Sequence, residues 1–143
     1  MRTNVTPLLL LDTHTWFWAV MGSLEEKSPE AVRAIRQASE RNGVFVSAIS
    51  LWELAMLEVR GRIKMRMEPL IWIKRALAAP GLELEELTPE VAVASARLSG
   101  SAPRDPSDRI MISTAMSLNA VLVSCDREII SYCEKLGLPH LGY

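Results

Sequence analysis

Three short runs of consecutive apolar residues constrain the fold of this chain most strongly. They cover residues 8–11, 44–46 and 120–124, and none of them alternates apolar with charged residues. Short continuous runs are typical of strands buried on both faces of a parallel sheet. Segments with helical apolar spacing lie between them, and strands that alternate with helices predict helices on both faces of such a sheet. The expected fold is therefore a three-layer α/β/α domain with a mainly parallel central sheet.

Capping residues set the expected ends of the helices. Ser28, Glu68, Thr88 and Asp105 each precede a proline, which is a favourable first residue of a helix. Helices are expected over residues 13–21, 29–41, about 51–59, 89–98, 106–118 and 127–136, and the third of them is capped by Ser47 or by Ser50. A further helix is expected to start at Pro69 and to be stopped by Pro80 and Gly81. Residues 82–85 alternate in polarity and predict an edge strand. Residues 1–143 read as a single domain, because no linker or repeat interrupts them.

Four carboxylates are placed where such a sheet binds its ligands. Asp12 and Asp126 follow buried strands, while Glu53 and Asp108 lie in early turns of helices that follow the same edge. Ligands of open α/β sheets bind beyond the carboxyl ends of the strands. We therefore expect these four side chains to lie close together.

Helix capping offers a purely structural explanation for each acid. Asp12, Asp105 and Asp126 are suited to cap the helices that follow them, and an acid in the first turn, as at Asp108, favours the positive end of the helix dipole. Glu53 completes a Ser50-x-x-Glu53 capping box if Ser50 is the cap, but not if Ser47 is. The sequence leaves both explanations open.

Clustered carboxylates are the chemistry of a site for Mg²⁺ or Mn²⁺. Hard divalent cations take oxygen ligands, and a bound dication relieves the repulsion among the acids. Such ions activate water and orient phosphodiesters, so hydrolysis needs no nucleophilic side chain. Asp12, Glu53, Asp108 and Asp126 are the predicted metal ligands and catalytic acids of a metal-dependent nuclease.

Four segments in order, residues 10–14, 46–53, 104–109 and 122–126, resemble the PIN-domain ribonucleases of the VapC toxin type. The resemblance spans nearly the whole chain. It implies a parallel α/β/α fold, Mg²⁺- or Mn²⁺-dependent cleavage of RNA such as transfer RNA, a homodimer, and a cognate antitoxin. It makes Asp12, Glu53 and Asp108 the core acids and Asp126 the fourth. Asp105 would support the helix start or an outer-sphere water, and Ser124 would orient a carboxylate or water. Cys125 departs from the family, which often has a basic residue there.

Composition limits how RNA could be held. The net charge is −1, so attraction for nucleic acid must come from metal ions or a local patch. The run Arg60, Arg62, Lys64 and Arg66 is the one candidate patch, for RNA phosphates or for an acidic antitoxin segment, and its structural alternative is a solvated turn between helices. Trp16, Phe17, Trp18, Trp52 and Trp72 could stack on bases, line a partner groove or form core; His14 is expected to be packed or partly exposed.

The chain is expected to be cytoplasmic and to make no membrane contact. Its two cysteines, Cys125 and Cys133, match no zinc or redox spacing, and the leucine run ends at Asp12, too early for a membrane span. Two other functions compete with the nuclease. One is a magnesium-dependent phosphotransfer or receiver domain, disfavoured because His14 stands where a phosphotransferase would carry a second aspartate. The other is a catalytically silent PIN-like domain that only binds a partner.

Overall fold

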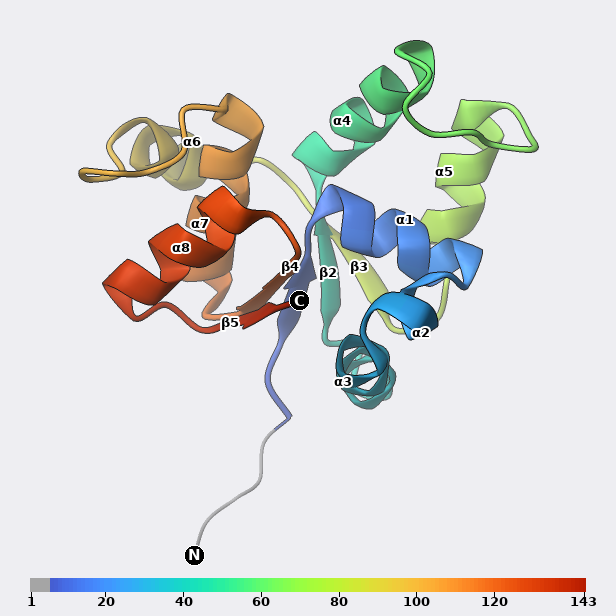
Figure 1. Cartoon of the computed structure of the whole chain (residues 1–143), viewed down its shortest axis with the longest axis horizontal. Coiled ribbons are helices and arrows are strands. Elements are labelled where there is room, and N and C mark those ends of the chain that lie inside the picture. The colour runs from blue at the N-terminus through green and yellow to red at the C-terminus, as the bar shows by residue number, and fades with distance from the viewer. Residues whose placement is uncertain (1–5) are drawn as a thin grey trace, which may run out of the picture.

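The computed structural model describes residues 6–143, in which five strands form one parallel sheet (Figure 1). The strand order is β3-β2-β1-β4-β5, and every neighbouring pair is parallel. The strands are β1 Leu9–Leu11, β2 Val44–Ser47, β3 Leu82–Glu85, β4 Val121–Ser124 and β5 His140–Gly142. The expected parallel sheet is confirmed, with the alternating segment as its edge strand β3.

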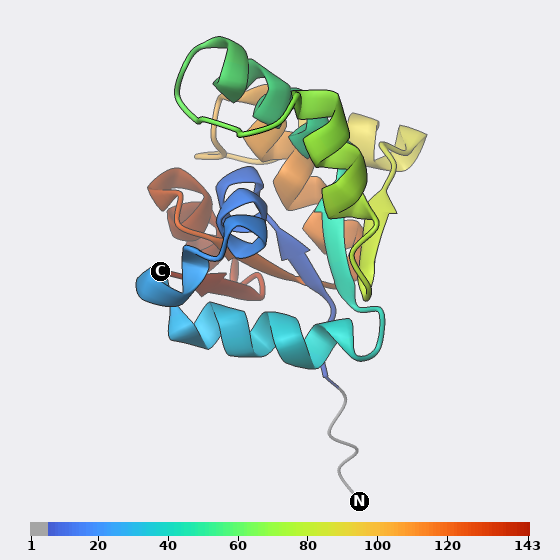
Figure 2. The ribbon, with the colours of Figure 1, turned by 90° about the vertical axis from the view of Figure 1, so that its right-hand side faces the viewer.

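Helices cover both faces of this sheet. They are α1 Thr13–Met21, α2 Leu24–Lys27, α3 Pro29–Ser39, α4 Ala48–Val59, α5 Pro69–Leu77, α6 Pro89–Ala96, α7 Pro106–Leu118 and α8 Arg127–Leu136. In Figure 1, α6, α7 and α8 lie on one side of the sheet and α1, α2, α3 and α5 on the other; Figure 2 shows α5 in front of the strands and α3 below them. The predicted three-layer α/β/α arrangement is therefore confirmed. None of the helices within residues 6–143 is long and apolar enough to cross a membrane.

The central strand β1 supplies residues to both hydrophobic cores. Leu9 and Leu11 belong to one cluster with Trp16, whereas Leu10 belongs to the other with Ile112. Successive side chains of a strand point to opposite faces, so a strand covered on both sides has no polar position. This explains why the first apolar run shows no alternation.

The structure decides which serine caps α4. The Ser47 hydroxyl accepts a hydrogen bond from the Ile49 amide at 3.2 Å, and Ser50 lies inside the helix. The alternative in which Ser50 is the cap is therefore wrong, because the chain already turns into the helix at Ala48. Glu53 is the sixth residue of α4, and the capping box no longer explains it.

Two short elements were not predicted, the four-residue helix α2 and the three-residue strand β5. Two helices also end earlier than expected. Helix α3 ends at Ser39, because the backbone turns through Asn42, which has a positive φ of 55°. Helix α6 ends at Ala96 rather than near residue 98.

The strand order places a crevice beside β1. The chain runs from β1 outward through β2 to β3, and then returns to β4 on the opposite side of β1. Such a reversal leaves space between the loops that follow the two central strands, and ligands of doubly wound sheets bind there. Asp12 directly follows β1 and Asp126 lies two residues after β4, so both face this crevice.

Candidate active site

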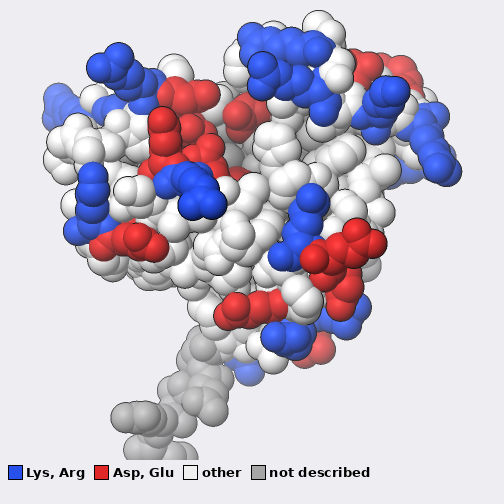
Figure 3. Space-filling view, viewed as in Figure 1, with Lys and Arg blue, Asp and Glu red and all other residues white. Residues whose placement is uncertain are grey.

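A pocket of about 470 Å³ at this edge of the sheet contains the predicted carboxylates. It is lined by all four aspartates of the chain and by Glu53, together with Thr13, His14, Trp18, Arg62, Met111, Cys125 and Ile129. Figure 3 shows acidic side chains gathered in the hollow between the α7–α8 side of the molecule and α4. We call this space the acidic pocket. The structure thus brings Asp12, Glu53, Asp108 and Asp126 together.

Asp12 is the most deeply buried of these acids, at 6% exposure. It ends β1 and caps α1, where its Oδ1 atom accepts a hydrogen bond from the Thr15 amide at 2.8 Å. Its Oδ2 atom accepts a hydrogen bond from the Ser124 hydroxyl at 2.5 Å. Burial raises the pKa of Asp12, while the hydrogen bonds from Ser124 and Thr15 act in the opposite direction. Ser124 is thus placed to orient this carboxylate.

Glu53 reaches the acidic pocket from α4 and is held there by Thr13. The buried Thr13 hydroxyl donates a hydrogen bond to Oε1 of Glu53 at 2.6 Å. The Ser50 hydroxyl lies 3.0 Å from the Thr13 hydroxyl. Burial raises the pKa of Glu53, and the nearby Asp105, Asp12 and Asp126 raise it further. Thr13 follows Asp12 directly, so one turn of chain supplies one acid and fixes another.

Asp105 and Asp108 open α7 one turn apart. Asp105 caps the helix by accepting a hydrogen bond from the Ser107 amide at 2.8 Å. Asp108 is half-buried, and no hydrogen bond reaches its carboxylate from the described residues. The pKa of Asp108 is raised to about 7, chiefly by burial and also by repulsion from Asp126 and Asp105. Asp108 therefore has no partner among the described residues that would stabilise its negative charge.

Asp126 caps α8 and is connected to β4. Its Oδ1 atom accepts hydrogen bonds from the amides of Glu128 at 2.9 Å and Ile129 at 3.1 Å. Its own amide donates to the Ser124 hydroxyl at 3.0 Å. The capping roles expected for Asp12, Asp105 and Asp126 are therefore real. Capping does not account for Glu53, which lies well inside α4.

The donor set suits a hard divalent cation. Within residues 6–143 the one ion pair, at 4.0 Å, joins Glu134 to His140, so none of the five pocket carboxylates is neutralised by a basic side chain at that distance. No group of three or more His, Cys, Asp or Glu side chains in the described residues is already arranged to hold a metal ion. The oxygen chemistry fits Mg²⁺ or Mn²⁺, whereas coordination requires the side chains to move closer together.

Three residues have roles at or near the site that the sequence did not predict. Thr13 holds Glu53, and Arg62, predicted only as part of a basic run, also lines the acidic pocket. Arg109 donates hydrogen bonds to the carbonyl oxygens of Ser95 at 2.9 Å and Pro103 at 3.0 Å, which fixes the segment leading to Asp105. A threonine next to a strand-end aspartate and an arginine after Asp108 were visible signals, but their partners are distant in sequence.

The remaining candidates have mainly structural surroundings. The His14 ring is exposed and lies 5.4 Å from the Trp18 ring, and Trp16, Phe17 and Trp72 are buried in one core. Burial raises the pKa of the Cys125 thiol, which favours its neutral form, and a cysteine supplies none of the positive charge that a basic residue would bring to the pocket. Both cysteines are free.

The chain belongs to the PIN domain family, whose sequence pattern it matches over residues 9–135. Among curated proteins it is similar to Ribonuclease VapC22 of Mycobacterium tuberculosis (strain ATCC 25618 / H37Rv). The two are 34% identical over 124 residues, which cover 87% of this chain and 91% of VapC22. The resemblance to VapC-type PIN domains seen in the sequence is therefore confirmed.

Solved structures show the same fold. The VapBC2 complex of Rickettsia felis bound to a DNA fragment from its promoter contains a chain that aligns with a TM-score of 0.62 and 16% identity, over 94% of this chain and 98% of that one. FitAB bound to an IR36 DNA fragment contains a chain that aligns with a TM-score of 0.60 and 17% identity, over 94% of both chains. At these identities the likeness concerns the fold.

Proposed function

We propose that this protein is a metal-dependent endoribonuclease and the toxin of a toxin–antitoxin pair. The observation that carries the proposal is that all four aspartates of the 143-residue chain, together with Glu53, line one pocket at the switch point of the sheet. The similarity to a VapC ribonuclease supports RNA as the substrate.

The distribution of helix caps argues that these aspartates are not there for capping alone. Four helices have caps that do not line the acidic pocket. These are α3, α4, α5 and α6, capped by Ser28, Ser47, Glu68 and Thr88. Aspartate caps occur at α1, α7 and α8, and all three side chains line the pocket. Hydroxyl caps serve a helix about as well as aspartate caps do. Three of the four caps outside the pocket carry a hydroxyl and only Glu68 carries a carboxylate, so the three aspartate caps concentrate negative charge at the pocket.

Asp12, Glu53, Asp108 and Asp126 are the proposed metal ligands. A bound Mg²⁺ or Mn²⁺ supplies an activated water and charge neutralisation for phosphodiester hydrolysis. Ser124 and Thr13 orient Asp12 and Glu53, and Asp105 stabilises the start of α7 and can accept a hydrogen bond from water. The exposed Arg62 at the pocket is placed to contact a phosphate.

The proposal includes the setting of this activity. Transfer RNA is one candidate substrate, a cognate antitoxin is the expected inhibitor, and a homodimer is the expected assembly. The expected location is the cytoplasm, where RNA substrates are available. These features follow from the resemblance to VapC-type proteins.

Cleavage of a mixed pool of transfer and messenger RNA tests the proposal. Purified protein is assayed with Mg²⁺ or Mn²⁺ and with EDTA, beside the variants Asp12→Asn and Asp108→Asn. Glu30→Gln is the matched control, since Glu30 is an exposed acid in the first turn of α3 outside the acidic pocket. Circular dichroism verifies that each variant is folded.

The expected result is cleavage by wild type and Glu30→Gln that EDTA and both aspartate substitutions abolish. Equal activity of the wild type and the two aspartate variants would mean that the proposed acids do not catalyse cleavage and that a contaminating nuclease is present. Absence of metal binding in isothermal titration, together with absence of cleavage, would favour the silent, partner-binding domain instead.

A further inference from the structure

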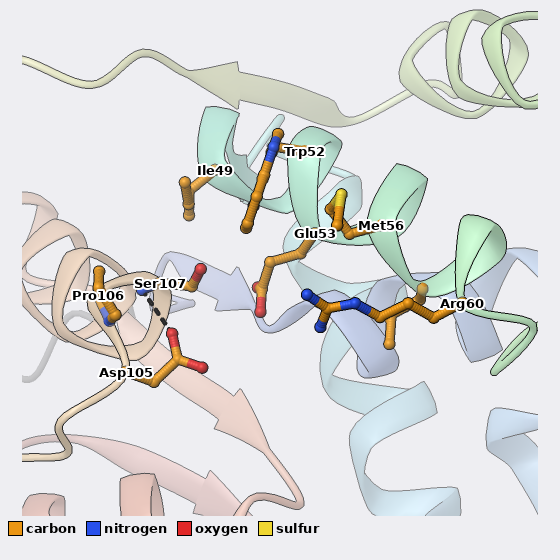
Figure 4. Close-up of a pocket in the computed structure, with 9 residues that line it drawn as sticks. Ile49, Trp52, Glu53, Met56, Arg60, Asp105, Pro106 and Ser107 are labelled. Carbon is orange, nitrogen blue, oxygen red and sulfur yellow. Dashed lines mark hydrogen bonds between the residues drawn. The ribbon is translucent and has the colours of Figure 1, made fainter.

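An apolar groove of about 660 Å³ adjoins the acidic pocket, between α4 and the start of α7. Its lining includes Ile49, Trp52, Met56, Leu57, Arg60 and Pro106. It shares Glu53 and Asp105 with the acidic pocket, so the two spaces are continuous. Figure 4 shows Trp52 and Glu53 projecting from α4, Arg60 from the position directly after this helix, and Asp105 from the start of α7.

Trp52 differs from the other tryptophans in its exposure. It is 57% exposed, whereas Trp16 and Trp72 are 1% and 5% exposed and contact each other edge to face. Trp18 is half-buried and contacts Tyr143. Trp52 therefore contributes little to the core and presents a large aromatic surface to the groove. An aromatic surface of this kind stacks on nucleobases of any sequence.

Two exposed arginines lie along the same route. Arg60 lines the groove and Arg62 lines the acidic pocket, and neither has a carboxylate within 4.0 Å among the described residues. Figure 3 shows basic side chains over this end of α4 and the loop after it, above the acidic hollow. The chain as a whole carries a charge of −1, so a polyanion must be attracted by a local strip such as this one.

We propose that the groove binds the nucleotide next to the scissile phosphate of single-stranded RNA, with its base on Trp52 and a phosphate on Arg60. This inference rests on the proposed function, because a strand whose phosphate lies at the acids must continue along the adjoining surface. The order of features supports an RNA strand. Arg62 lies beside the carboxylates of the acidic pocket, and Trp52 lies with Arg60 in the adjoining groove. An apolar protein segment would use Trp52 and Leu57 but leave both arginines without a role.

Equilibrium binding tests the proposal without relying on catalysis. Fluorescence anisotropy is measured with a short fluorescein-labelled single-stranded RNA of mixed sequence, in EDTA so that the RNA stays intact. Trp52→Leu keeps an apolar side chain but removes the aromatic face, whereas Trp52→Phe keeps a smaller face. Arg60→Gln removes one charge from the groove, and Arg33→Gln removes one from the exposed surface of α3 as the matched control.

Trp52→Leu is expected to weaken RNA binding by roughly 5- to 150-fold, and Trp52→Phe by clearly less. Arg60→Gln is expected to lower the slope of log affinity against log salt by about 0.7, and Arg33→Gln to leave it unchanged. Equal RNA affinity of wild type and Trp52→Leu would overturn the proposal and leave the groove to a protein partner. If wild type cleaves RNA in that case, the proposed function still stands; if wild type neither binds nor cleaves RNA, both fail.

Discussion

The Ser124 hydroxyl donates a hydrogen bond to Oδ2 of Asp12, joining residues that are 112 positions apart in the sequence. The same hydroxyl accepts a hydrogen bond from the amide of Asp126. One side chain at the end of β4 therefore orients the buried acid after β1 and is itself held by the loop that carries a second acid. The two central strands of the switch point are linked through this serine.

Ser124→Ala is expected to lower cleavage activity by about 10- to 100-fold, as loss of a group that orients a metal ligand commonly does. The hydrogen bond from Ser124 lowers the pKa of Asp12, so its loss raises that pKa. The acid limb of the pH–rate profile is therefore expected to move to higher pH. A profile of cleavage rate against pH at fixed Mg²⁺ measures both effects. Ser113→Ala is the control, because the Ser113 hydroxyl is buried without a hydrogen-bond partner in the described structure. An unshifted Ser124→Ala profile would contradict the role of Ser124.

Metal-free protein is expected to lose stability as the pH rises toward neutrality. Burial and neighbouring carboxylates raise the pKa of Asp108 from 3.8 to about 7. A carboxyl with a raised pKa binds its proton more tightly in the folded state, so its contribution is fully present below pH about 4 and is lost as the pH passes about 7. Asp12 and Glu53 act in the same direction, since burial raises the pKa of both.

Thermal unfolding in EDTA between pH 4 and 8 measures this loss. Asp108→Asn is expected to flatten the dependence and to raise the midpoint temperature of the metal-free protein at pH 8, although it abolishes activity. Mg²⁺ is expected to stabilise wild type at pH 8 more than it stabilises Asp108→Asn. A wild-type midpoint that rises steadily up to pH 8 in EDTA would show that the acids are not under mutual repulsion.

Thr13→Val is expected to reduce both activity and stability. Valine matches the shape of threonine and water can replace the hydrogen bond to Glu53, but the buried Ser50 hydroxyl loses its partner, so the stability cost should be about 1–3 kcal/mol. The carboxylate of Glu53 loses the hydroxyl that fixes it, and the resulting freedom lowers kcat. Thr114→Val is the control, since the buried Thr114 hydroxyl donates to the Ile110 carbonyl within α7. Comparable kcat values for the two variants would argue against a special role for Thr13.

Arg109→Lys is expected to destabilise the fold by about 1–3 kcal/mol, the cost of leaving polar groups without partners. The Arg109 guanidinium donates to carbonyl oxygens of Ser95 and Pro103, and a single ammonium group cannot reproduce this forked geometry. Urea unfolding at neutral pH measures the change. Arg104→Lys, at an exposed position nearby, should leave the midpoint unchanged. A wild-type midpoint for Arg109→Lys would show that the arginine is dispensable for the segment before Asp105.

The sequence predicted the elements whose signals are local. Helix α8 was predicted with its observed ends, because Asp126 caps its start and Gly137 adopts a positive φ at its end. Strand β5 was missed because its three residues, two half-buried and one exposed, are too few to show a periodicity. Helix α2 was missed for a similar reason, since it spans a single turn.

The location of the acids was predictable, but the contacts among them were not. Strand-end positions indicated that Asp12 and Asp126 would share an edge, and this required only the topology of parallel sheets. The Thr13–Glu53 hydrogen bond depends on how α1 crosses α4, which no local pattern specifies. The choice between Ser47 and Ser50 likewise depended on the backbone turn after β2. The raised pKa of Asp108 depends on its burial and on the charges of Asp126 and Glu53, which only the folded chain brings near it.

The position of β4 late in the sequence has a consequence for the nascent chain during translation. The strand that pairs with β1 on its second side, and the serine that orients Asp12, are synthesised only after residue 120. A nascent chain that has reached α7 carries Asp12, Glu53 and Asp108 but lacks the neighbour against which β1 is placed. Under the proposed function, a nascent chain is therefore not expected to cleave the RNA of the translating cell before β4 has been synthesised.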